Sequence, residues 1–75
     1  MKATLIRDAY GRRAIVTEDK ALRLFPDPHS VDQKTASWWP VTASQREALL
    51  ATAVNAVEVE YDAEASRRYG QPIWH

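Results

Sequence analysis

The residues best suited to catalysis or metal binding are few and widely spaced. The histidines are His29, in a proline-rich stretch, and His75 at the C-terminus. Histidine is the usual base and metal ligand near neutral pH. Asp27 and Asp32 flank His29, but this spacing matches no metal-binding motif, and the chain has no cysteine to supply a thiolate ligand. We therefore predict no metal site.

The serines also lack the surroundings of a nucleophile. None has the glycine neighbours of a nucleophile elbow, and Ser44 is better explained as a helix cap. The chain has only Gly11 and Gly70, which cannot build a phosphate-binding loop. A chain of 75 residues also has little depth for a ligand pocket. These observations predict a protein that is not an enzyme and needs no cofactor.

An acidic row near the C-terminus is the most distinctive charge pattern, and it consists of Glu58, Glu60, Asp62 and Glu64. Residues 57–62 alternate hydrophobic and acidic side chains, which is typical of a strand. The two valines and Tyr61 would then face the core, and the carboxylates would line the other face about 6.7 Å apart. A basic groove could bind such a row as it binds a nucleic-acid backbone. The alternative is a solvated face or an edge protected by its charge.

A competing basic site lies at a predicted hairpin near the N-terminus, and its residues are Arg7, Tyr10, Arg12 and Arg13. It resembles the wing of a winged-helix protein, in which arginine contacts phosphate and an aromatic ring stacks on a base. Residues 41–50 are similar to the first helix of bacterial helix-turn-helix regulators. The segment that follows is acidic, however, and DNA would repel it. Nucleic-acid binding is therefore the weaker alternative.

Three of the seven aromatic residues are tryptophans: Trp38, Trp39 and Trp74. Each indole buries on the order of 200 Å² when enclosed, so most of them should be structural. Trp39 precedes Pro40, which favours extended backbone at this position. Adjacent side chains in an extended segment point to opposite sides. We therefore expect one of Trp38 and Trp39 to be partly exposed, where it could anchor a partner.

The elements that position these residues begin with an antiparallel meander. Strands are expected over residues 2–8, 13–18 and 21–25, with a glycine turn at Gly11. Pro26-Asp27-Pro28 then stops the third strand, and residues 26–37 are expected to form a loop.

The clearest predicted helix follows Pro40. Two overlapping capping boxes, Thr42 with Gln45 and Ser44 with Glu47, mark its start. One apolar face follows, formed by Leu49, Leu50, Ala53, Val54 and Val57.

The end of this helix is less well defined by the sequence. A helix continuing to Tyr69 would stack Glu60 on Glu64, so a strand over 57–62 is favoured. Asp62 could then cap a short final helix, with Arg67 and Arg68 near its end and Gly70 just beyond. Residues 71–75 form a tail unless Ile73 and Trp74 dock onto the core.

Length and composition fix the general class. The 75 residues allow a single domain, 1–75, and the lack of cysteine excludes a disulfide scaffold. Ten Lys and Arg balance ten Asp and Glu, which excludes a broadly basic nucleic-acid binder. No apolar run could span a membrane, so we expect a cytoplasmic protein without membrane partners. The expected fold is α+β: a small antiparallel sheet of three to four strands packed against one amphipathic helix, with a short C-terminal helix.

In its size, its Met1-Lys2-Ala3 opening into a strand, its lack of catalytic motifs and its acidic row, the chain resembles the small phage-borne anti-CRISPR proteins. The resemblance implies a cofactor-free inhibitor that binds a CRISPR effector or another nucleic-acid-binding complex, with the acidic row in place of phosphates. We therefore expect a non-catalytic protein-binding module or inhibitor. The candidate partner-binding residues are Glu58, Glu60, Asp62, Glu64, Trp38 and Trp39. A small regulator that binds nucleic acid through the basic hairpin, and a self-assembling accessory protein, are the alternatives.

Overall fold

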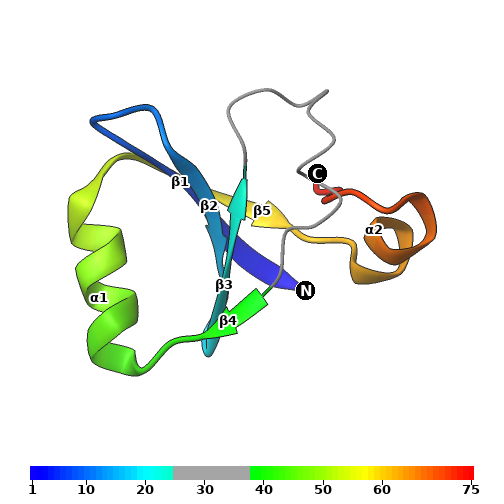
Figure 1. The fold of residues 1–75 in the computed structure, drawn as a ribbon, viewed down its shortest axis with the longest axis horizontal. Coiled ribbons are helices and arrows are strands. Elements are labelled where there is room, and N and C mark those ends of the chain that lie inside the picture. Colours follow the sequence, from blue (N-terminus) through cyan, green and yellow to red (C-terminus); the bar gives the residue numbers. More distant parts are fainter. Residues whose placement is uncertain (25–37) are drawn as a thin grey trace.

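The computed structural model describes residues 1–24 and 38–75 and has an α+β fold (Figure 1). Its elements are β1 (Lys2–Asp8), β2 (Arg13–Val16), β3 (Lys20–Leu24), β4 (Trp38–Pro40), α1 (Ala43–Thr52), β5 (Ala53–Glu60) and α2 (Ala63–Tyr69). Within the described residues the strands form one sheet in the order β4-β3-β2-β1-β5, with every neighbouring pair antiparallel. The predicted fold class is confirmed. The sheet has five strands rather than three or four, because the Trp38–Pro40 segment pairs with β3.

The two faces of the sheet are covered by different elements, as Figure 1 shows, with α1 on one side and α2 on the other. On the α1 face, Leu49 and Leu50 pack against a buried cluster of Ile6, Val16, Ala21 and Val41. On the α2 face, Trp38 and Trp74 pack against a buried cluster of Ala3, Ile15, Leu24 and Tyr61. The alternation of side chains along each strand thus serves two small cores.

The predicted β1–β2 hairpin is confirmed. Thr4 pairs with Val16 and Arg7 with Arg13, and Gly11 adopts the expected positive φ of 83° in the turn. A second tight turn joins β2 to β3, in which the Thr17 backbone N–H donates to the Lys20 carbonyl over 2.8 Å. Arg46 of α1 donates from Nε to the Thr17 carbonyl over 3.1 Å and so ties the helix to this turn.

The predicted apolar helix face is wrong beyond Leu50. The helix ends at Thr52, and Ala53, Val54 and Val57 belong to β5. The reason is pairing: β5 forms a long ladder with β1 that joins Ala3 to Val59, and a strand also suits the β-branched valines. The strand favoured over 57–62 is confirmed as far as Glu60, and it begins four residues earlier than expected.

Both predicted caps of α2, Asp62 at its start and Gly70 at its end, are confirmed. The Asp62 side chain accepts a hydrogen bond from the Ala65 backbone N–H over 2.9 Å, and Gly70 is left-handed with a φ of 69°. Residues 71–75 are not a free tail. Trp74 forms a bridge with Tyr61, and the Ile73 N–H donates to the Ser66 hydroxyl over 2.8 Å. The loop predicted over residues 26–37, which includes Asp27, His29 and Asp32, lies outside the described residues.

Candidate functional site

The structure divides the four predicted carboxylates between β5 and the start of α2. β5 ends at Glu60, so Asp62 and Glu64 belong to the start of α2. Three of the four carboxylates have partners within the chain. Glu60 binds the N-terminal ammonium, and Glu64 lies 3.3 Å from Arg68. Asp62 caps α2 through Oδ1, and its Oδ2 lies 3.9 Å from His75 Nε2. Glu58 is exposed and has no ion pair with a described residue.

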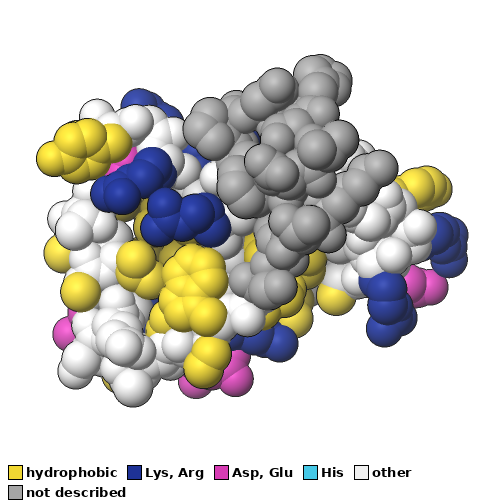
Figure 2. All heavy atoms as spheres, in the orientation of Figure 1, with side chains coloured by type: hydrophobic (Ala, Val, Ile, Leu, Met, Phe, Trp, Pro, Cys, Tyr) yellow, Lys and Arg dark blue, Asp and Glu magenta, His cyan; other side chains and the backbone are white. Residues whose placement is uncertain are grey.

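The basic hairpin residues do meet at one end of the sheet, where Figure 2 shows Lys and Arg side chains beside an exposed hydrophobic side chain. Arg7 lies opposite Arg13 in the β1–β2 ladder. The Arg12 guanidinium lies 5.2 Å from the centre of the Tyr10 ring, which is 85% exposed. This pair could stack on a planar ligand.

Asp8 neutralises part of that charge. Its carboxylate accepts hydrogen bonds from Arg12 Nε over 2.7 Å and from the Tyr10 and Arg12 backbone N–H groups over 2.9 Å each. Desolvation raises the pKa of Asp8, but these hydrogen bonds and the Arg12 charge outweigh it, so the pKa lies below its ordinary value. Arg12 is therefore held by the hairpin itself.

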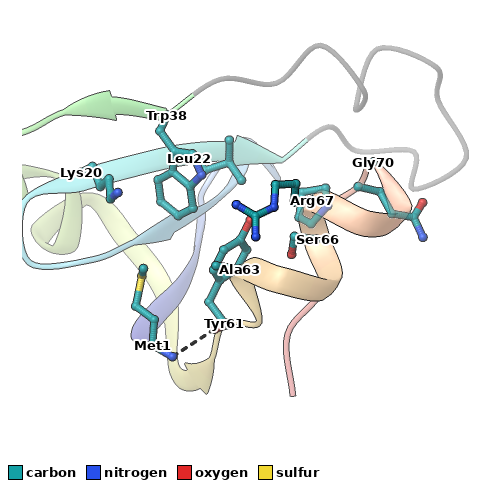
Figure 3. Close-up of a pocket in the computed structure, with 11 residues that line it drawn as sticks. Met1, Lys20, Leu22, Trp38, Tyr61, Ala63, Ser66, Arg67 and Gly70 are labelled. Carbon is teal, nitrogen blue, oxygen red and sulfur yellow. Dashed lines mark hydrogen bonds between the residues drawn. The ribbon is translucent and has the colours of Figure 1, made fainter.

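Trp38 lines a hollow of about 310 Å³ between the sheet and α2 (Figure 3). Its ring meets Tyr61 edge to face with centres 5.2 Å apart, and the Lys20 ammonium lies 5.6 Å from the ring centre. Figure 3 shows Arg67 reaching from α2 toward Tyr61. The Ser66 hydroxyl donates to the Asp62 carbonyl over 2.6 Å and accepts from Ile73. Ser66 therefore has a structural role here.

Trp39 points to the opposite face from Trp38, as expected, and both indoles are half-buried. Trp39 borders a shallow apolar depression of about 350 Å³ against α1, together with Val41 and Leu49. Each tryptophan thus contributes to one of the two cores and keeps part of its ring accessible.

β5 lies at the edge of the sheet, which was one of the alternatives for this segment, but the sequence did not indicate that part of the edge is open. Met1 and Tyr61 exchange both main-chain hydrogen bonds, at 3.1 and 2.8 Å, so Tyr61 turns its main-chain groups toward β1. Main-chain groups alternate along a strand. Glu60, Glu58 and Ala56 must therefore turn theirs outward, away from β1.

The C-terminus covers only the first of these outward positions. Glu60 and His75 exchange two main-chain hydrogen bonds, at 3.0 and 2.9 Å. Glu58 and Ala56 have no such partner among the described residues. The edge is open from Glu58 back to Asn55, beyond which the register of the β1–β5 ladder shifts.

The side chains of this open segment are also largely exposed. Val54 is 59% exposed and Val57, which was expected to face the core, is 50% exposed. The prediction for Val57 is wrong because β5 is an edge strand and has no neighbour on its outer side. The strand pattern could be read from the sequence, but an edge position depends on which strands pair, and the local pattern does not contain that information.

Residues 1–24 and 38–75 contain no group of three or more metal-ligating side chains placed to hold a metal ion. In the same part of the chain, no helix is long and apolar enough to cross a membrane. Comparisons with protein-family models, curated proteins and solved structures gave no match.

Proposed function

We propose that this chain is a non-catalytic protein-binding module whose interface is the open edge of β5. The observation that carries the proposal is the pair of outward main-chain positions, Ala56 and Glu58, on either side of the half-exposed Val57. An exposed strand edge is a template for an additional strand, and main-chain hydrogen bonds provide the affinity of such complexes.

Natural proteins guard exposed edges with charge, proline, bulges or covering segments. On β5 these protective features lie toward the ends of the strand. Two charged residues, Glu58 and Glu60, lie toward one end, and the register shift beside Asn55 lies toward the other. The segment Asn55–Val57 carries no charge and no proline. The opposite edge of the sheet, β4, spans three residues and ends in Pro40. β5 is therefore the described edge that suits strand addition.

The test uses proline to remove one outward N–H group. Ala56→Pro deletes a donor that β1 does not use, and proline is tolerated at such edge positions. Ala43→Pro is the matched control, because it places proline at the first residue of α1, where the N–H is also unused. The immobilised wild type and Ala43→Pro should retain the same partner, and Ala56→Pro should lose it. Equal retention by all three folded proteins would overturn the proposal.

The resemblance to anti-CRISPR proteins suggests a narrower version, in which the partner is a CRISPR effector or another nucleic-acid-binding complex. Glu58 is then the carboxylate best placed to meet a basic groove, because the other three already have partners within the chain. The edge of β5 would provide the main contact, and Glu58 would add charge at one end of it.

A second candidate function is binding of single-stranded nucleic acid at the hairpin tip. The observation that favours it is the exposed Tyr10 ring with the Arg12 guanidinium beside it. Stacking on an aromatic ring contributes about 1–3 kcal/mol per base. Tyr10→Ala should then lower the affinity for an oligonucleotide by about fivefold or more, while Tyr69→Ala, at an exposed tyrosine in α2, should not. Equal retention by both variants would exclude this site.

A further inference from the structure

We infer that the strand which adds to β5 is β5 of a second copy of this chain, so that two sheets join into one across a two-fold axis. The inference rests on the proposed function and names its partner. Symmetric pairing of this kind uses the same surface on both subunits, and the segment must therefore be complementary to itself.

The main-chain pattern selects an antiparallel register centred on Val57. Ala56 of one chain then exchanges both main-chain hydrogen bonds with Glu58 of the other, and Glu58 does the same with Ala56. Val57 lies between these positions and faces Val57 of the second chain as a non-hydrogen-bonded pair. Such a pair brings side chains into direct contact, which would bury the two half-exposed valines against each other.

This register also avoids placing one carboxylate directly opposite another. Each Glu58 lies opposite the small, neutral Ala56 of the other chain, and no carboxylate lies directly opposite another. A register centred on Glu58 would place two carboxylates face to face, which is destabilising. A register centred on Ala56 would bring Glu58 opposite Val54, where the ladder to β1 is already irregular.

The covered and irregular parts of the edge limit the pairing to residues 55–59. Glu60 is occupied on its outer side by His75. In the register centred on Val57, the residue opposite Glu60 is Val54, which lies at the register shift. The regular part of one strand therefore ends where the covered part of the other begins, and the two limits coincide.

A single introduced cysteine tests the register, because the chain has no cysteine of its own. Facing residues of a non-hydrogen-bonded pair have Cα atoms about 4.5 Å apart, which is within disulfide range. Val57→Cys should form a covalent dimer under mild oxidation. Val54→Cys is the matched control, since Val54 lies on the same strand and is at least as exposed as Val57 but does not face itself. Equal cross-linking of the two variants would overturn the register.

A charge exchange tests the pairing without a covalent bond. The mass of the wild type in sedimentation should rise from 8.5 kDa toward twice that value with concentration. Val57→Lys and Val57→Glu should each stay monomeric, and an equal mixture should dimerise again; Val54→Lys should behave as the wild type. Circular dichroism confirms that each variant is folded. A wild type that stays monomeric at every concentration would overturn the self-pairing.

These outcomes separate the two proposals. A monomeric wild type that still retains another protein, and loses it on Ala56→Pro, would overturn self-pairing and keep the open edge as the interface. A monomeric wild type whose retained proteins are unchanged by Ala56→Pro would overturn both.

Discussion

The Asp8 side chain stabilises the turn that joins β1 to β2. Its carboxylate accepts hydrogen bonds from the Tyr10 and Arg12 backbone N–H groups and from the Arg12 guanidinium, beside Gly11. Because its pKa is lowered in the folded state, Asp8 contributes stability above the ordinary carboxyl pKa. That contribution is lost as the pH falls through the lowered folded-state value.

The Asp8→Asn variant should therefore melt below the wild type at neutral pH, and the difference should disappear in acid, once the pH falls below the lowered pKa of Asp8. Thermal unfolding followed by circular dichroism over a series of pH values measures this. Glu47→Gln, at an exposed residue of α1, serves as the control and should melt like the wild type at neutral pH. A constant difference between Asp8→Asn and wild type at all pH values would contradict the role given to the charge.

Gly70 is the C-cap of α2, and its conformation can be tested by substitution. It ends α2 in a left-handed conformation, and a side chain there would meet no atom within 4 Å. The cost of Gly70→Ala is thus conformational and should be about 1–2 kcal/mol. This lowers the melting temperature by about 4–8 °C per kcal/mol in a domain of this size. Gly70→Asn should cost less, because asparagine tolerates this conformation, and equal losses would argue against the conformational cause.

At the scale of elements, the start of α1 was predictable in kind but ambiguous in position. The sequence contains two overlapping capping boxes, and the structure uses the first. Gln45 N–H donates to the Thr42 hydroxyl over 3.2 Å, and the Thr42 N–H donates to the Gln45 side chain over 2.8 Å. Ser44 lies inside the helix and is exposed.

Thr42→Ala should therefore destabilise the protein by about 1 kcal/mol, the usual cost of losing an N-cap side chain. Ser44→Ala should have almost no effect, although the sequence alone makes the two sites equivalent. Chemical denaturation of both variants gives the comparison. A larger loss for Ser44→Ala would mean that the helix begins two residues later.

The sequence predicted those elements whose signals are local. The hairpin at Gly11, the caps Asp62 and Gly70, and the extended Trp38-Trp39 segment depend on neighbouring residues, and all of them hold. The end of α1 did not hold, because Ala53, Val54 and Val57 fit a helical face as well as a strand. Only the distant β1 ladder decides between them. The candidate site is non-local in the same way, since an open edge exists only once the strand order is known.

Across the molecule, acidic and basic groups are equal in number, and several of them also form ion pairs. The N-terminal ammonium meets Glu60, Arg12 meets Asp8, and Arg68 meets Glu64. Each of these pairs places a cationic group beside one carboxylate. A partner that binds a row of phosphate-like charges would find three of the four predicted carboxylates already engaged within the chain.

Glu58→Gln should accordingly keep the partner of the wild type, with a change of less than tenfold in dissociation constant. The open main-chain groups remain, and one exposed charge contributes about 1 kcal/mol or less. Titration of the purified partner at low and moderate salt measures this, with Glu64→Gln as the control. A much larger, salt-dependent loss confined to Glu58→Gln would favour imitation of phosphates over strand addition.

The pairing of His75 with Glu60 also determines where any added residues would go. The C-terminal segment runs antiparallel to β5, with Trp74 beside Tyr61 and His75 beside Glu60. A peptide fused after His75 would continue in the same direction, beside Val59 first and then beside Glu58 and Ala56. An affinity tag at that end could therefore occupy the edge as an intramolecular competitor and hide the activity it was meant to reveal. A handle attached through a cysteine at the exposed Ala51 avoids this.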